Sequence, residues 1–138
     1  MMSARRPVVE TVNTVRRWQM IDVTDRVREA IAQSDIKSGF VIVFVEHTTA
    51  AITIQENADP DVQHDLLSKL EELVPQLETY YQHDEGNSDA HLKTAMLGNS
   101  VTAIIDNGRM LLGRWQGIFF VEFDGPRERR MLIKVVGE

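Results

Sequence analysis

The sequence predicts an α+β protein in which a mostly antiparallel β-sheet or sandwich carries two or three helices. The last third of the chain contains several β-rich runs separated by turn residues, with no helix between them, which favours antiparallel pairing. Two other segments combine a helix-capping residue with apolar residues at helical spacing. The 138 residues are 43% hydrophobic and 26% charged, which suits a single domain over residues 1–138.

The first half of the chain alternates predicted strands with one helix. The β-branched run 8–15 predicts an opening strand. Asp22 or Thr24 can cap the helix that follows. Its apolar face, ahead of a stop at Ser38-Gly39, contains Val23, Val27, Ala30 and Ile31. Residues 40–46 are apolar until the last, which predicts a strand buried on both faces, and the alternating run 51–55 predicts a half-buried strand.

Two further helices have clear start signals. Aspartate suits the N-cap and proline the first helical position, so Asp59-Pro60 predicts a helix that ends before Pro75. Its apolar stripe contains Val62, Leu66, Leu70 and Leu73. A second helix is predicted to begin at Ser88 or Asp89 and to stop at Gly98. The side chains expected to face inward from it are Leu92, Ala95 and Met96.

The last third is predicted to form hairpins. Asn107-Gly108 is the preferred dipeptide of a two-residue hairpin turn and joins the runs 101–105 and 110–112. Gln116-Gly117 is expected to interrupt the chain before the apolar run 118–123. A turn at 124–126 then leads into a final strand, 130–136.

The composition excludes several classes of protein. There are no cysteines, so disulfides and thiolate chemistry are excluded. The net charge is −6, and the densest basic run, 127–130, is interrupted by an acid, so nucleic acid is not expected as a partner. No apolar run is long enough for a membrane span, and the start of the chain lacks the apolar core of an export signal. The expected location is therefore the cytoplasm.

Three of the four histidines are candidate metal ligands. His47 follows the apolar run 40–46, and His83 and His91 flank an acidic segment. Three imidazoles can hold a divalent ion and leave a fourth position open for water or substrate. The alternative is two surface histidines and one that is hydrogen-bonded near a strand end. His64 lies off the apolar stripe of its helix and is expected to face solvent.

Other polar residues near these histidines are candidate substrate ligands. Thr48 and Thr49 can donate hydrogen bonds to an oxyanion, and Glu56 can act as a general base or ligand. The alternative assigns these groups to hairpin and capping roles, with Glu56 and Asn57 left open.

Two glycines surround Trp115 and Gln116 in the segment 112–118. Tryptophan with glutamine can stack on and hydrogen-bond a heteroaromatic ring. Taken alone, the segment favours a β-bulge with Trp115 as a packing residue.

Five motifs in order along the chain resemble the YjbQ family, small proteins known as secondary thiamine-phosphate synthase enzymes. The resemblance runs from Val15 to Glu138. The motifs cover residues 47–57, 81–86, 89–93, 97–100 and 113–118. Two departures concern hydroxyl groups: the family commonly has Thr-Ser-Ala-Ser where this chain has Thr48-Thr49-Ala50-Ala51, and threonine where it has Arg114.

The resemblance implies an α+β sandwich that assembles as a homotrimer. It also implies a metal or anion site lined by His47, His83 and His91, and a weak ability to join hydroxymethylpyrimidine diphosphate to thiazole phosphate. Displacing diphosphate usually requires magnesium held by carboxylates, whereas three imidazoles suit zinc. The expected cofactor is therefore a divalent ion, zinc from the ligand set or magnesium from the chemistry.

Three functions compete at this point. The first is a metal-dependent enzyme acting on a small phosphorylated molecule, as a thiamine-phosphate synthase-like transferase. In it Glu56 is an acid/base or ligand, Asp89 supports the metal ligands, and the phosphate-side candidates are Thr48, Thr49, Asn57 and Arg127. The second is a zinc-type hydrolase of a small phosphorylated substrate. The third is a non-catalytic trimeric module that binds a small anionic ligand.

Overall fold

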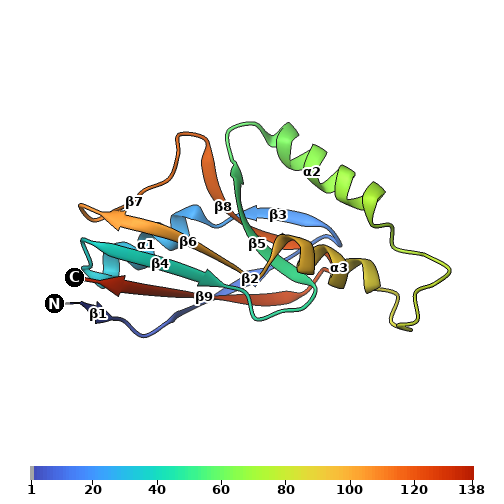
Figure 1. Cartoon of the computed structure of the whole chain (residues 1–138), viewed down its shortest axis with the longest axis horizontal. Coiled ribbons are helices and arrows are strands. Elements are labelled where there is room, and N and C mark those ends of the chain that lie inside the picture. The colour runs from blue at the N-terminus through green and yellow to red at the C-terminus, as the bar shows by residue number, and fades with distance from the viewer. Residues whose placement is uncertain (1) are drawn as a thin grey trace.

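A computed structural model describes residues 2–138, which form two β-sheets and three helices. Figure 1 shows how these elements are arranged. The helices are α1 (Thr24–Ser34), α2 (Pro60–Leu73) and α3 (Ser88–Leu97). The strands are β1 (Ser3–Ala4), β2 (Val8–Asn13), β3 (Gln19–Asp22), β4 (Gly39–Phe44), β5 (Ala50–Glu56), β6 (Ser100–Asp106), β7 (Arg109–Met110), β8 (Gln116–Glu122) and β9 (Glu128–Gly137).

All strand pairs in the described residues are antiparallel, and they form a six-stranded and a three-stranded sheet. The six-stranded sheet has the order β1-β9-β4-β6-β7, and β2 also pairs with β9. The three-stranded sheet has the order β3-β8-β5. The α+β prediction with a mostly antiparallel sheet is confirmed.

The main core lies between the two sheets and α1. It draws Val41 and Val43 from β4 and Ile118 and Phe120 from β8. A second cluster on the other side of the three-stranded sheet packs Phe119 and its neighbours against α2 and α3. The three-stranded sheet is therefore covered on both faces.

The six-stranded sheet has one uncovered face, so the prediction that residues 40–46 are buried on both faces is wrong. Val41 and Val43 are buried, but the Phe44 side chain is 44% exposed. Side chains alternate between faces along a strand, and no helix of the described chain covers the face of Phe44. The apolar run therefore has one face in the core and one face open.

Side-chain hydrogen bonds lie at the starts of α1 and α2, although the cap position of α1 is Val23, not the predicted Asp22 or Thr24. Asp22 Oδ1 accepts hydrogen bonds from the backbone N–H and the hydroxyl of Thr24, at 2.9 and 2.5 Å. Asp59 Oδ1 accepts the backbone N–H of Asp61 at 2.9 Å, with Pro60 in the first turn, as predicted. No residue of α2 is fully buried, so α2 packs less deeply than its apolar stripe suggests.

Helix α3 presents the opposite face to the one predicted. Leu92 and Met96 were expected inward, but they are 46% and 58% exposed, and Ala95 is also exposed. Asp89 and Lys93 are buried instead, at 0% and 1% exposure. The charged face points inward because Asp89 and Lys93 form ion pairs there with Arg17 and Glu71 from other segments.

The hairpin at Asn107-Gly108 is confirmed, with φ of 52° and 76° at the two turn residues. The later strands depart from a chain of simple hairpins. Strand β8 begins at Gln116, so Gln116-Gly117 belongs to the strand, and β8 and β9 lie in different sheets. Within residues 2–138, no helix is long and apolar enough to cross a membrane.

Candidate functional site

The predicted site residues fall into two groups at opposite ends of the three-stranded sheet. Strands β5 and β8 are antiparallel, so Ala50 lies opposite Glu122 at one end and Glu56 opposite Gln116 at the other. Seven extended residues span about 20 Å. The segment with His47 lies at the first end, and Glu56, Asn57, Trp115 and Gln116 lie at the second, so one chain does not bring the two groups together.

A polar cavity of about 320 Å³ marks the first end. Its walls come from the segment after β4, the loop before α3, helix α3 itself and the start of β9. The lining residues are Glu46, His47, Thr48, Thr49, Glu85, Asn87, His91, Arg127 and Arg129. The structure therefore brings together five of the predicted site residues: His47, Thr48, Thr49, His91 and Arg127.

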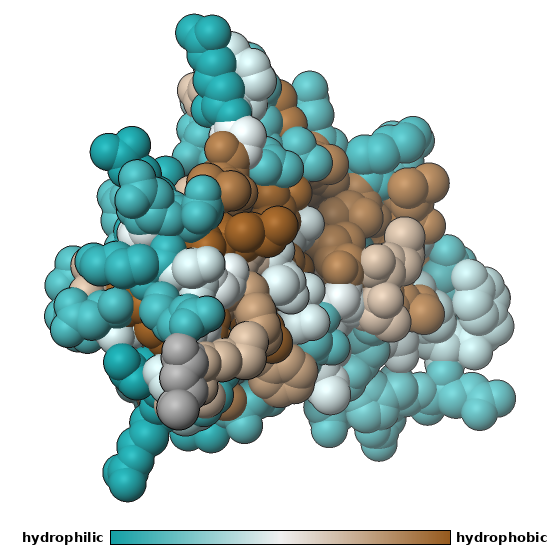
Figure 2. Space-filling view, turned by 60° about the vertical axis from the view of Figure 1, so that its left-hand side comes forward, coloured by the Kyte–Doolittle hydropathy of each residue, from teal (hydrophilic) through white to brown (hydrophobic). Residues whose placement is uncertain are grey.

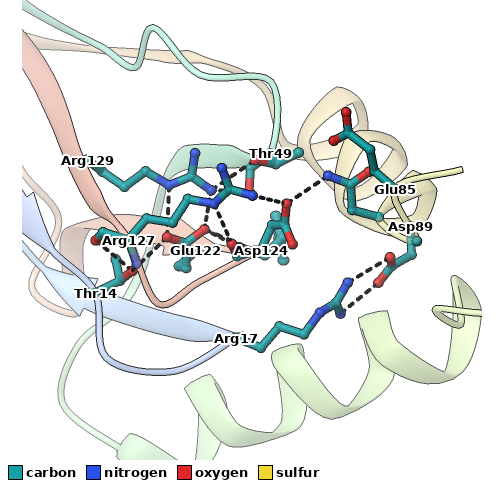
Figure 3. A network of polar contacts seen from close by, with 12 residues as sticks. Thr14, Arg17, Thr49, Glu85, Asp89, Glu122, Asp124, Arg127 and Arg129 are labelled. Carbon is teal, nitrogen blue, oxygen red and sulfur yellow. Dashed lines mark hydrogen bonds and ion pairs between the residues drawn. The ribbon is translucent and has the colours of Figure 1, made fainter. Parts of the chain in front are cut away.

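Arg129 lines this cavity and forms a buried ion pair with Glu122 (Figure 3). Arg129 Nε donates to Glu122 Oε1 at 2.8 Å, and Arg129 Nη2 donates to Oε2. The Thr14 hydroxyl donates to Oε1 at 2.7 Å, and the backbone N–H groups of Phe123 and Asp124 donate to Oε2 at 3.1 and 3.0 Å. Burial opposes ionisation of Glu122, but these hydrogen bonds outweigh it and lower the pKa of its carboxyl.

Arg129 also connects this ion pair to Thr49. Its Nη2 donates to the Thr49 hydroxyl at 2.9 Å and to the Thr49 carbonyl at 3.2 Å. Among residues 2–138 no acceptor engages the remaining terminal nitrogen, Nη1, although Arg129 lines the cavity. Arg129 therefore retains a free donor on a side chain that is held rigidly.

Arg127 lies next to Arg129 and is held by Asp124 (Figure 3). Its Nε donates to the Asp124 carbonyl at 2.8 Å and its Nη2 to Asp124 Oδ2 at 2.7 Å, while half of its side chain stays exposed. Asn87 Nδ2 donates to the same carboxylate oxygen at 2.8 Å, and its own Oδ1 is buried with no partner in the described residues. Arg127 thus presents a second fixed guanidinium to the cavity.

His47 is a neutral hydrogen-bonding group. Burial lowers the pKa of its imidazole, and the positive charge of Arg129 lowers it further. Its Nε2 accepts the backbone N–H of Arg130 at 3.1 Å. This arrangement leaves the ring proton on Nδ1, which is then a donor.

His91 is shared between the polar cavity and a second, more apolar hollow. That hollow, of about 450 Å³, is lined by His83, Ser88, His91 and Leu92. The His83 and His91 rings meet edge to face with centroids 5.6 Å apart. His83 Nε2 lies 3.7 Å from Glu85 Oε2. His83 and His91 are therefore neighbours, and His91 shares the polar cavity with His47.

Asp89 does not line the cavity. Arg17 donates two hydrogen bonds to it at 3.1 and 3.2 Å, Lys93 Nζ donates at 3.0 Å, and Lys93 also reaches Glu71 at 2.9 Å. Burial opposes the ionisation of Asp89, but hydrogen bonds from these two cations outweigh it and lower its pKa. The role predicted for Asp89 at the catalytic site, as support for the metal ligands, stays a prediction, and its observed contacts are those of a structural ion pair.

The second group surrounds an exposed tryptophan. Trp115 is 53% exposed, and the Arg114 guanidinium lies 4.7 Å from its ring centroid. Asn57 donates its backbone N–H to the Trp115 carbonyl at 2.9 Å, and Gln116 Oε1 accepts the N–H of Gly113 at 2.7 Å. Trp115 therefore does not pack as a buried side chain. The ligand roles predicted for Glu56 and its neighbours stay predictions.

Sequence reasoning missed Glu122, Arg129, Thr14 and Asn87. One signal was present, because Glu122 is an acid inside the apolar run 118–123. A carboxylate in a buried strand requires a buried partner. The identity of that partner depends on the packing of β9 against β5 and β8.

The described residues contain no group of three or more histidine, cysteine, aspartate or glutamate side chains placed to hold a metal ion. His47 and His91 line the polar cavity, whereas His83 lines only the adjacent hollow. The predicted zinc or magnesium cofactor stays a prediction.

The model of the UPF0047 protein YjbQ-like family matches residues 9–138. The chain belongs to this family. The UPF0047 protein of Methanocaldococcus jannaschii is 48% identical over 127 residues, which cover 92% of this chain and 91% of that protein. UPF0047 protein YugU of Bacillus subtilis is 46% identical over 126 residues, covering 91% and 96%.

Solved structures of family members share the fold. A YbjQ-like protein of unknown function from Sulfolobus solfataricus is 33% identical and superposes with a TM-score of 0.94, covering 100% of both chains. A YjbQ/UPF0047 family protein from Clostridium acetobutylicum is 46% identical with a TM-score of 0.91, covering 93% of this chain and 98% of that chain.

These findings correct the predicted function. The relatives carry only UPF0047 family names, and the Sulfolobus protein is described as having unknown function. Nothing in them points to thiamine-phosphate synthesis or zinc-dependent hydrolysis, and the described residues lack a metal site. The prediction of a metal-dependent enzyme is therefore wrong. The resemblance identified the family and the fold but not an activity.

Proposed function

We propose that the polar cavity binds a small phosphorylated molecule. The observation that carries this proposal is the placement of two guanidinium groups, Arg127 and Arg129, on one cavity wall, each held by its own carboxylate. Arginine presents planar donors that match phosphate oxygens. Because both side chains are already fixed, little conformational entropy is lost when an anion binds.

Of the other groups that line the cavity, some favour the binding of an anion and one opposes it. The neutral His47 ring and the exposed Thr48 hydroxyl add two donors to the pair of arginines. Glu46 is engaged by Arg130, with Nε 3.0 Å and Nη2 2.8 Å from its carboxylate. Glu85 is the lining carboxylate with no arginine or lysine partner in the described residues, and its charge opposes a highly charged ligand.

The experiment is calorimetric titration of the protein with inorganic phosphate, compared between two variants. Arg127→Gln removes a cavity donor, and Arg28→Gln is its matched control. Both arginines are ion-paired to the aspartate three residues earlier, and their side chains are 50% and 56% exposed. We expect Arg127→Gln to weaken binding about tenfold or more, the loss of one hydrogen bond to a charged group, and Arg28→Gln to leave it unchanged. No binding to the unaltered protein, or equal loss in both variants, contradicts the proposal.

We also propose that the chain assembles as a homotrimer through the uncovered face of the six-stranded sheet. Most side chains on that face are apolar, and Thr102 and Lys134 flank Ile42 as polar exceptions. The apolar members are Val9, Phe40, Ile42, Phe44, Ile104, Leu132 and Val136. In Figure 2, which brings the left-hand ends of these strands forward, brown side chains gather across the middle of the view. A largely apolar sheet face that no other element covers is typical of protein interfaces.

Light scattering on the purified protein tests this assembly. We expect a mass near three times 15.7 kDa and a shift toward monomer in Phe44→Lys, which places a charge on the face. Val15→Lys is the control, because Val15 is also exposed, at 69%, but lies outside the sheet. A monomeric parent protein at micromolar concentration contradicts the assembly.

A further inference from the structure

The reversed orientation of α3 creates an apolar hollow beside the polar cavity. Leu92 is 46% exposed and lines this hollow, while Asp89 and Lys93 of the same helix are buried. A single exposed leucine is common on protein surfaces, but Leu92 lies directly beside a polar cavity. Leu92 therefore offers apolar surface to a ligand that extends out of that cavity.

The hollow and the polar cavity share a wall. His91 lines both, and its ring lies edge to face with that of His83, with centroids 5.6 Å apart. No arginine, lysine, aspartate or glutamate is among the described residues that line the hollow. Four such residues line the polar cavity: Glu46, Glu85, Arg127 and Arg129. A molecule that extends from the polar cavity into the hollow therefore meets hydrogen-bond donors and charged groups at one end and an apolar wall at the other.

We propose that the Leu92 hollow holds an apolar or aromatic group attached to the phosphate in the polar cavity. The ligand class is then a phosphomonoester with a short apolar substituent. This inference rests on the proposed function. Its chemical basis is that Leu92 supplies apolar surface, and the faces and edges of two imidazole rings favour contact with another ring.

The test compares two phosphomonoesters that share the same anion. Methyl phosphate can fill only the polar cavity, whereas phenyl phosphate adds a ring that reaches across His91. We expect the parent protein to bind phenyl phosphate about tenfold more tightly, the change produced when a small apolar area leaves water. Calorimetric titration measures both dissociation constants.

Two neutral substitutions on α3 locate the source of this preference. Leu92→Ser removes the apolar wall of the hollow, and Met96→Ser alters a side chain that is 58% exposed on the same helix but does not line the hollow. Both positions are exposed, so neither change is expected to disturb folding. We expect Leu92→Ser to abolish most of the phenyl preference without changing methyl phosphate binding, and Met96→Ser to retain the preference.

The outcomes separate this inference from the proposed function. If methyl phosphate binds through Arg127 but phenyl phosphate binds no better, the inference is wrong and the anion site stands. If neither ester binds, the proposed function fails and the inference fails with it. Equal loss of preference in Leu92→Ser and Met96→Ser would show that the preference does not come from the hollow. A change of molecular mass in Leu92→Ser would assign the surface to a partner chain. Either result overturns the inference.

Discussion

Replacing Glu122 by glutamine should destabilise the fold, because it leaves the Arg129 guanidinium buried without its counter-ion. Glu122 is 0% and Arg129 is 5% exposed, so solvent does not replace the lost charge. Removing one partner of a buried pair costs about 3–5 kcal/mol. That is a large part of the total stability of a domain, which is about 5–15 kcal/mol.

Urea unfolding followed by circular dichroism measures this change as a shift in midpoint at constant slope. The double variant Glu122→Gln with Arg129→Met removes both charges and should be less destabilised than the sum of the two single variants. A loss below about 1 kcal/mol in Glu122→Gln would refute the view that this ion pair supports the cavity wall.

The same carboxylate gives a pH dependence with a defined sign. The pKa of Glu122 is lowered in the folded protein from its ordinary value of 4.5, so its contribution to stability is complete above that value. The contribution is lost as the pH falls below 4.5 through the folded pKa. Glu122→Gln should therefore show a shallower loss of stability with acid than the parent protein.

Two further changes test other parts of the fold. Lys93→Met leaves Asp89 and Glu71 without the ammonium group that lies 3.0 and 2.9 Å from their carboxylates. We expect it to lower the free energy of unfolding, measured by urea titration, by about 3 kcal/mol. An unchanged midpoint would refute a stabilising role for Lys93. Asp59→Ala removes the cap of α2 and should cost about 1 kcal/mol, measured by thermal unfolding, whereas the neighbouring exposed Asp65→Ala should have less effect.

Features that depend on neighbouring residues could be predicted from the sequence. The cap at Asp59 and the turn at Asn107-Gly108 each depend on a few adjacent residues, and both are present as expected. The face of α3 could not be predicted from its own apolar residues. Its orientation depends on Arg17 and Glu71, which lie 72 and 22 residues from their partners.

The candidate site was predictable in part for the same reason. His47, His91 and Arg127 carry chemistry that a sequence reveals, and they line one cavity. Their separation from Glu56 and Trp115 follows from the antiparallel register of β5 and β8, which places the two segments at opposite ends of a sheet. The role of Arg129 depends on its ion pair with Glu122, which lies in a strand of the other sheet. The spacing of the two residues along the sequence does not reveal this pairing.

Strand β9 gives the cavity an unusual dependence on long-range order. It pairs with β1, β2 and β4; Arg129 is its second residue, and Arg127 directly precedes it. Any fluctuation that detaches β9 removes both guanidinium groups at once and opens the larger sheet. An anion bound between them should slow the hydrogen exchange of β9 amides far from the cavity, so that occupancy is communicated along the whole length of the strand.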